Sequence, residues 1–324
     1  MREGCRFRAP WRAVLLLLVV LLQPPTGATE AALSARIIGT YHADILACPR
    51  PACSVLATIP LDASISVAGA SINGFMPVRY KSSAGFVDGT YVYAPSLGSR
   101  PPEFSEGAAG CNRVALIFNI GAGFPPATDV LDTLENDQVP ATMFVMGWWA
   151  DHHGDLLKRI VGDGFAIGSH GNLPPELTGR ADDDVASDLR TAAQAITRAA
   201  GAPPGPWFTP YAAAIDDRVR GIAASEGYLP IAWTVRSEDW RPDATADDVY
   251  HRVVTNAGDG SIVELHLDAS TSLDSTATAL PWIIRDLRAE GFHFVTIPDM
   301  LQPCESSAGS PIPVSPAIAS PVSR

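Results

Sequence analysis

The stretch VALIFNIGAGFPPATDVLDTLENDQVPATMFVMGW, residues 114–148, predicts the fold of the largest part of the chain. Residues 114–120 are a continuous apolar run of strand length, and residues 126–136 have the spacing of an amphipathic helix. Residues 141–148 are a second apolar run. A strand, a helix and a strand in this order are typical of a βαβ unit, whose two strands lie parallel.

The same alternation continues to residue 303. We expect further helices at 156–161, 182–200, 247–256 and 276–290, and further strands at 231–235, 261–267 and 292–297. Repeated βα units predict an α/β fold with a parallel sheet, either doubly wound or closed into a barrel. In a barrel the functional residues lie at the carboxyl ends of the strands, so candidate site residues are sought there.

Residues 36–94 have a different, β-rich pattern. Strand-length runs occur at 55–59, 64–67 and 76–80, and turn residues such as Asn73-Gly74 separate them. Several short strands in so short a segment predict a small all-β barrel that precedes the α/β region.

The first residues are typical of a secretory signal peptide. Four arginines within residues 1–12 precede the apolar run 13–22, and small residues follow at 26–28. The run is shorter than the roughly 20 residues that a membrane span needs. We therefore expect residues 1–28 to be a cleaved signal and the protein to be secreted or in the cell envelope, without other membrane contact; an uncleaved anchor is the alternative.

Export affects how the cysteines are interpreted. Once Cys5 leaves with the signal, an even set of four remains, which in an oxidising compartment favours disulfides. Cys48 and Cys53 are close in sequence, and Cys111 and Cys304 stand at the two ends of the α/β region. We predict the pairs Cys48–Cys53 and Cys111–Cys304. The alternative, a zinc site, lacks a CxxC pair.

Composition excludes some partners. The 324 residues include 23 Lys+Arg and 35 Asp+Glu, a net charge of −12, and the only lysines are Lys81 and Lys158. This balance argues against nucleic acid as the main partner and against polybasic binding to a membrane surface. Hydrophobic residues make up 47% of the chain, enough for a folded core.

The β-rich segment resembles the bacterial Src-homology-3-like domain. Residues 57–63, 73–80 and 85–92 read ATIPLDA, NGFMPVRY and GFVDGTYV, similar to that family's GTLPKGT, NGWxKVRY and GWVSGxYL. Such modules usually bind cell-wall glycan or peptide, and a spacer without a ligand is the alternative.

The α/β region resembles the NodB-like polysaccharide deacetylases, carbohydrate esterase family four. VPATMFVMGWWA at 139–150 and GFAIGSH at 164–170 are similar to the family's VPATFFVTGxWA and GHEIGSH. The resemblance covers residues 111–303 and implies an irregular (β/α) barrel. The family hydrolyses the carbon–nitrogen bond of N-acetyl groups with a metal, usually zinc, held by one Asp and two His. A second Asp is the base and a His is the acid.

The motifs that would hold the metal are substituted. The family's TFDDG reads IFNIG at 117–121, so the base position is Asn119 and the metal Asp is Ile120. In HxxxH, His170 is present, but its partner position is Pro174. A catalytic zinc ordinarily has three protein ligands, and His170 alone is a partial set.

The remaining motifs are partly kept. RxPY reads FTPY at 208–211, with Phe208 for the Arg that orients the base, and DxxDW reads RSEDW at 236–240. The resemblance assigns the carboxylate that supports the acid His to position 236, which is Arg236. The acid itself is retained as His266, at the end of an apolar strand.

The resemblance therefore implies few candidate site residues. Candidate catalytic residues are His266, Asn119 and Asp239, and candidate substrate-binding residues are Tyr211, Trp240 and Pro210. Further aromatic residues near strand ends (Trp148, Trp149, Trp207 and Phe208) either stack on sugars or belong to the core. A metal could alternatively bind Asp151, His152, His153 and Asp155, but these residues read as the solvated start of a helix.

These observations give three functional hypotheses. The leading one is an exported, cofactor-free pseudoenzyme that binds N-acetylated glycan such as peptidoglycan. The second is an active zinc-dependent deacetylase with a rearranged site, and the third is a structural protein with no carbohydrate ligand. The expected organisation is a signal at 1–28, a β-domain at 36–94, a mobile linker at 95–110, the deacetylase-like domain at 111–303 and a disordered Pro/Ser-rich tail at 305–324.

Overall fold

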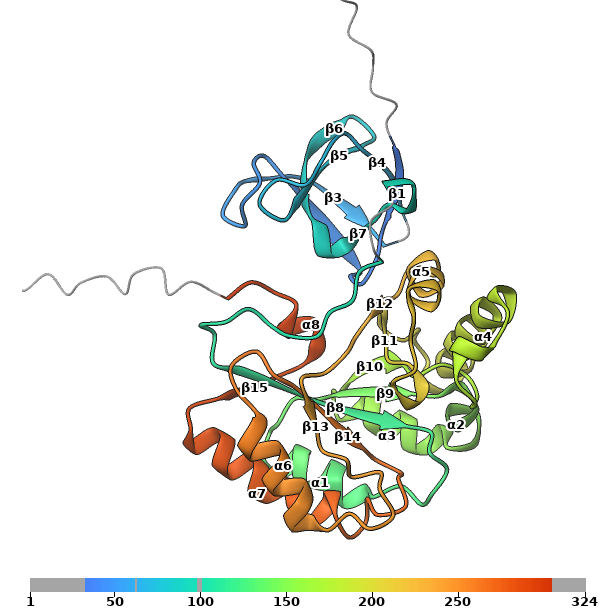
Figure 1. Cartoon of the computed structure of the whole chain (residues 1–324), viewed down its shortest axis with the longest axis vertical. Helices are drawn as coiled ribbons and strands as arrows, with labels where there is room; N and C mark the ends of the chain where they lie inside the picture. The colour runs from blue at the N-terminus through green and yellow to red at the C-terminus, as the bar shows by residue number, and fades with distance from the viewer. Residues whose placement is uncertain (1–32, 62, 98–100, 305–324) are drawn as a thin grey trace, which may run out of the picture. The chain divides into compact units, whose positions relative to one another are not determined.

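The computed structural model describes residues 33–61, 63–97 and 101–304 (Figure 1). The predicted signal peptide and C-terminal tail lie outside these residues. Within the part of the chain that is described, none of the helices combines the length and apolar composition needed to cross a membrane.

The first part of the described chain is all β. Its seven strands are β1 (Leu33–Ile37), β2 (His42–Leu46), β3 (Val55–Pro60), β4 (Ser64–Val67), β5 (Phe75–Tyr80), β6 (Ser83–Asp88) and β7 (Val92–Tyr93). They form one antiparallel sheet in the order β3-β2-β6-β5-β4-β1-β7. Alternate side chains face its core: Ile65 and Val67 of β4 are buried, whereas Ser64 is exposed. The predicted all-β segment is therefore present.

The larger part is α/β, as predicted. Its strands are β8 (Arg113–Ile120), β9 (Thr142–Val145), β10 (Ala166–Ser169), β11 (Trp207–Phe208), β12 (Leu229–Pro230), β13 (Val235–Arg236), β14 (Ile262–His266) and β15 (His293–Val295). They pair in parallel in the order β12-β11-β10-β9-β8-β14-β13, and β15 pairs with the start of β8. The curled sheet is an irregular, incompletely closed (β/α) barrel, in agreement with the predicted fold class.

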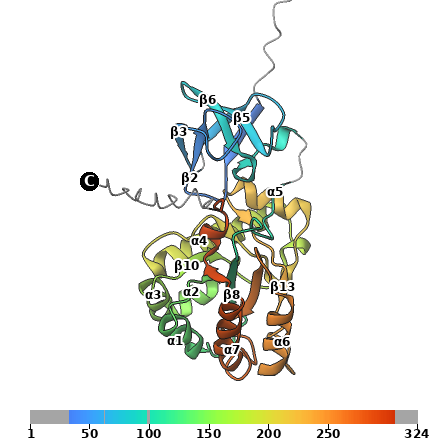
Figure 2. The same cartoon turned by 90° about the vertical axis from the view of Figure 1, so that its left-hand side faces the viewer.

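Helices surround this sheet, and most of them cover its outer face. They are α1 (Thr128–Asn136), α2 (Gly147–His152), α3 (Gly154–Gly162), α4 (Asp182–Ala200), α5 (Asp217–Ser225), α6 (Ala246–Asn256), α7 (Thr276–Ala289) and α8 (Ile297–Met300). Helices α6 and α7 lie side by side in both views (Figures 1 and 2). The helix predicted at 182–200 has the same bounds in the structure, where Gly201 ends it with a left-handed φ of 81°.

Strand β8 explains why the opening run of the sequence is apolar without alternation. Leu116 and Phe118 pack on the side of the helices, whereas Ala115 and Ile117 pack inside the barrel. A strand covered on both faces buries every side chain, so its sequence is continuously apolar.

Two predicted strands differ in the structure. The strand expected at 141–148 ends at Val145, because the chain turns into α2 and buries Trp149 on the inner face of that helix. In the strand expected at 231–235, only Val235 belongs to a strand of the sheet, β13. Ile231 forms an isolated β-bridge to Phe104.

Part of the predicted linker is held against the barrel. The amide of Phe104 donates to the carbonyl of Pro230, and the carbonyl of Phe104 accepts from Ala232. The Phe104 side chain packs on the cluster inside the barrel, which gives this segment a hydrophobic anchor. Both predicted disulfides, Cys48–Cys53 and Cys111–Cys304, are formed.

Candidate functional site

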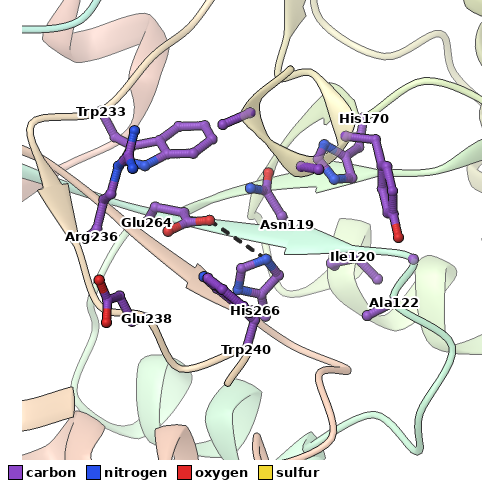
Figure 3. Close-up of a pocket in the computed structure, with 14 residues that line it drawn as sticks. Asn119, Ile120, Ala122, His170, Trp233, Arg236, Glu238, Trp240, Glu264 and His266 are labelled. Carbon is purple, nitrogen blue, oxygen red and sulfur yellow. Dashed lines mark ion pairs between the residues drawn. The ribbon is translucent and has the colours of Figure 1, made fainter. Parts of the chain in front are cut away.

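A cavity of about 310 Å³ opens at the carboxyl ends of the barrel strands, where the sequence predicted the site (Figure 3). Asn119 and Ile120 come from the end of β8, His170 follows β10, and Glu264 and His266 come from β14. The volume is at the lower end of the range for small-molecule pockets and suits a single sugar ring.

Strand register brings the polar residues together. In the parallel ladder, His266 of β14 lies opposite Asn119 of β8, and Glu264 lies opposite Ile117. Side chains alternate along a strand, so Glu264 and His266 face the barrel interior while Val263 and Leu265 pack toward the helices. The pocket floor is thus built from the inward positions of two neighbouring strands.

His266 and Asp239 form a close pair. Nδ1 of His266 lies 2.7 Å from Oδ1 of Asp239, and Oδ2 of Asp239 accepts hydrogen bonds from the His266 amide (2.8 Å) and the Thr276 hydroxyl (2.7 Å). Burial alone would lower the pKa of His266, but the Asp239 charge and hydrogen bond outweigh burial and raise that pKa to about 9. His266 is therefore an imidazolium at neutral pH.

This pair corrects one prediction. The resemblance assigned the supporting carboxylate to position 236 and so implied its loss, and that assignment is wrong. Arg236 is exposed at the end of β13, and Asp239, three residues further on and fully buried, contacts the imidazole instead. The chain therefore has a carboxylate in contact with His266.

Glu264 is a site residue that the sequence analysis missed. Its side chain is only 7% exposed, and Oε1 lies 3.5 Å from Nε2 of His266 (Figure 3). Burial raises the pKa of Glu264 to about 7, against the opposing effects of the His266 charge and a hydrogen bond with Asn119. The available signal was a charged residue at an inward position of the otherwise apolar run IVELH.

Asn119, Thr209 and His170 form a hydrogen-bonded chain. The hydroxyl of Thr209 donates to Oδ1 of Asn119 (2.8 Å), and Nδ1 of His170 lies 2.9 Å from the Thr209 carbonyl. Burial, aided by the His266 charge, lowers the pKa of His170 to about 3, so the ring is neutral. Its Nδ1 donates to the carbonyl, which leaves Nε2 as an acceptor.

The donor set does not fit a catalytic zinc. Ile120 is fully buried and packs in the core that the sheet shares with the helices, and proline at position 174 offers no side-chain donor. Across residues 33–61, 63–97 and 101–304, no group of three His, Cys, Asp or Glu could hold a metal ion. The alternative cluster near residue 151 does not converge either, since Asp151 pairs with Arg198 at 3.0 Å.

The rim of the cavity is aromatic. Trp240, which is 53% exposed, and Trp233, which was not foreseen from sequence, lie beside the cavity (Figure 3). Tyr211 also lines the cavity. Pro210 is buried next to Tyr211. The other aromatic candidates are buried or partly buried in clusters outside the site: Trp148, Trp149, Trp207 and Phe208.

Comparison with known proteins identifies polysaccharide deacetylases as relatives of this chain. The model of the polysaccharide deacetylase family matches residues 106–231. The chain is 32% identical over 212 residues to peptidoglycan-N-acetylglucosamine deacetylase PgdA of Listeria monocytogenes, covering 64% of this chain and 42% of that protein. It is 30% identical over 204 residues to chitooligosaccharide deacetylase of Bradyrhizobium, covering 59% of this chain and 92% of that protein.

A solved structure shares the fold. BA3943 of Bacillus anthracis, described as a CE4 family pseudoenzyme, matches with a TM-score of 0.58 and 22% identity, covering 74% of this chain and 83% of that chain. A mutant of the same protein is described as having restored enzymatic activity. The chain spans less than half of the Listeria protein, so it matches only part of that relative.

Proposed function

This chain belongs to the polysaccharide deacetylase family, and we propose that it binds N-acetylated cell-wall glycan in the cavity without hydrolysing it. The observation that carries the proposal is Ile120, a fully buried apolar side chain where the resemblance requires the metal-binding carboxylate. The named relatives act on peptidoglycan and chitooligosaccharides, which supports a glycan of this class as the ligand.

The missing residues remove two functions at once. A bound metal lowers the pKa of water from 15.7 to about 7, and a chain without the ligand set does not generate that nucleophile. An Asn amide at position 119 does not accept a proton, so the base is also absent. Neutral His170, hydrogen-bonded to Thr209, is left as a structural element of the pocket wall.

The features needed for binding are kept. The exposed face of Trp240 and the ring of Tyr211 offer flat apolar surface to the apolar face of a sugar. His266 and Asn119 offer polar groups at the floor. An intact, monosaccharide-sized cavity with aromatic walls and few polar groups is typical of a binding site.

The remaining parts support action outside the cytoplasm. The two disulfides are of the kind that persists in an oxidising compartment, consistent with residues 1–28 acting as an export signal. We propose that the β-rich segment β1–β7 is a Src-homology-3-like module that contacts the same cell wall.

The test combines binding and hydrolysis. Calorimetry should detect binding of an N-acetylglucosamine tetrasaccharide that is weakened about tenfold or more by Trp240→Ala, as expected for loss of an exposed stacking surface. Acetate release with added zinc should not exceed the protein-free rate. Absence of binding would contradict the proposal.

A second candidate is supported by the retained Asp239–His266 pair, which an idle site would not need. In that case the protein is an active deacetylase. Acetate release that is abolished by His266→Ala would establish it. As a positive control, the variant Asn119→Asp/Ile120→Asp/Pro174→His restores the residues that the family motif requires, and we expect it to gain zinc binding.

A further inference from the structure

Glu264 places a carboxylate at the floor of the cavity, where the neighbouring inward positions Ile117 and Ile262 are apolar. Burying a carboxylate is unfavourable unless it is paired and hydrogen-bonded. The family resemblance describes this segment only as an apolar strand that ends in His266, and it gives position 264 no role. Glu264 therefore lies at the boundary between these apolar positions and the polar residues Asn119 and His266.

The buried charges near Glu264 do not balance. Asp239 and His266 neutralise each other at 2.7 Å, whereas Glu264 lies 3.5 Å from the same imidazolium. Among the residues that the structure describes, no Lys or Arg forms an ion pair with Glu264. When Asp239, Glu264 and His266 are all ionised, the two carboxylates and the one imidazolium together carry a net charge of −1.

The other charged and titratable groups around Glu264 do not remove this excess. Arg236 lies opposite it in the ladder but has an exposed side chain, so solvent screens its charge. His170 is neutral, and Asn119 contributes only a hydrogen bond. Burial raises the pKa of Glu264, and the imidazolium of His266, which Glu264 shares with Asp239, offsets this rise only in part.

We infer that the sugar at the floor of this cavity carries a free amino group, so that the protein recognises a partially deacetylated glycan. This inference rests on the proposed glycan-binding function and deepens it. The ammonium group of a glucosamine ring supplies the missing positive charge and donates a charge-assisted hydrogen bond to Glu264. Neighbouring N-acetylated rings of the same glycan lie over the aromatic rim at Trp240.

The experiment compares tetrasaccharides by calorimetry with the disulfide-intact protein. One ligand is fully N-acetylated, and the other has a single free amine in place of one acetamide. We expect about tenfold tighter binding of the amine-bearing ligand, the usual effect of one hydrogen bond to a charged group. Glu264→Gln should abolish this preference.

Two further variants keep the test specific. Glu238→Gln removes the same charge from the rim, where Glu238 already pairs with Arg241 and Arg252, and it should keep the preference. Arg236→Gln removes a competing cation and should increase the preference. Thermal unfolding checks that each variant is folded. If Glu264→Gln does not fold, Arg236→Gln still tests the inference.

The outcomes separate this inference from the proposal on which it rests. Equal binding of the two ligands would overturn the amine preference and leave glycan binding in place. If Glu264→Gln keeps the preference for the amine-bearing ligand, the inference is also overturned. The same holds if Glu238→Gln reduces the preference as much as Glu264→Gln does, because the preference would then reflect general attraction of a cation to an acidic protein. Failure of both ligands to bind would overturn the proposed function and this inference together.

Discussion

At the scale of single residues, the site depends on how buried charges are compensated. Asp239 is fully buried and holds the imidazolium of His266, whose pKa rises from the ordinary 6.5 to about 9. A group with a raised folded-state pKa contributes stability that is complete below its unfolded pKa and is lost as pH rises toward the folded value. The pair therefore stabilises the fold at neutral pH and less so in alkali.

The first prediction follows from this linkage. Between pH 7 and pH 9, above the pKa of Glu264 (about 7) and up to that of His266 (about 9), the unfolding free energy of the wild type should fall. Asp239→Asn removes the charge that retains the proton, so its stability should change less over this window. Denaturant titrations at several pH values measure both slopes, and parallel slopes would contradict the assignment.

Asp268 gives a second prediction at this scale. Its fully buried carboxylate accepts hydrogen bonds from the amides of Gly121, Ala122 and Gly123, at 3.0, 3.1 and 3.0 Å. Asp268→Ala leaves three donors without an acceptor and should lower the unfolding free energy by about 2–4 kcal/mol. It should also weaken glycan binding, because the loop of Gly121 and Ala122 lines the cavity.

The matched control is Asp155→Ala. That carboxylate is exposed and pairs with Lys158 at the surface, so its loss should change stability by less than about 0.5 kcal/mol. Equal effects of the two substitutions on the midpoint of urea unfolding would show that the Asp268 hydrogen bonds do not secure the loop.

Residue-scale prediction from sequence depended on whether a motif was available. His266 and the substitutions at Asn119 and Ile120 could be placed from the resemblance, because parallel strands bring their carboxyl ends to one edge. The carboxylate that contacts His266 could not be predicted from the sequence. The path of the backbone after β13 decides which carboxylate of RSEDW reaches the imidazole. Glu264 was missed because its strand was identified only as an apolar run that ends in His266, and the charge at position 264 was given no role.

At the scale of elements, burial on both faces made the central strands easy to predict, whereas their ends were decided by tertiary contacts. The strand predicted at 141–148 stops at Val145, because the apolar residues after it are the buried face of α2. An apolar run alone does not distinguish a buried strand from the buried face of a helix. The long helix α4 was predicted with its observed bounds because acidic residues begin it and glycine ends it.

The end of α4 supplies the third prediction. Gly201 has φ of +81° with no atom near the position of an added Cβ, so Gly201→Ala tests backbone conformation without a clash. It should destabilise the protein by about 1 kcal/mol. Gly162→Ala, at the end of α3 and equally open but without a positive φ, should be neutral or stabilising by up to about 1 kcal/mol. Thermal unfolding compares the two, and the reverse order would contradict the capping role.

At the scale of the whole molecule, the Cys111–Cys304 disulfide joins the beginning and the end of the α/β region, across a sequence separation of 193. Cys48–Cys53 closes a separation of only 5. In the chain-entropy model the stabilisation by a cross-link grows with the logarithm of the loop it closes. The two bonds therefore differ in what they contribute, although they are chemically the same.

The fourth prediction compares their removal. Cys111→Ser/Cys304→Ser should lower the unfolding free energy by about 5 kcal/mol, and Cys48→Ser/Cys53→Ser by about 2 kcal/mol. Denaturant unfolding of the oxidised proteins measures both losses. Equal losses of unfolding free energy for the two pairs of substitutions would contradict this prediction. Loop length would then not determine how much each disulfide stabilises the protein, and native contacts around Cys48 and Cys53 would have to account for the effect of the short bridge.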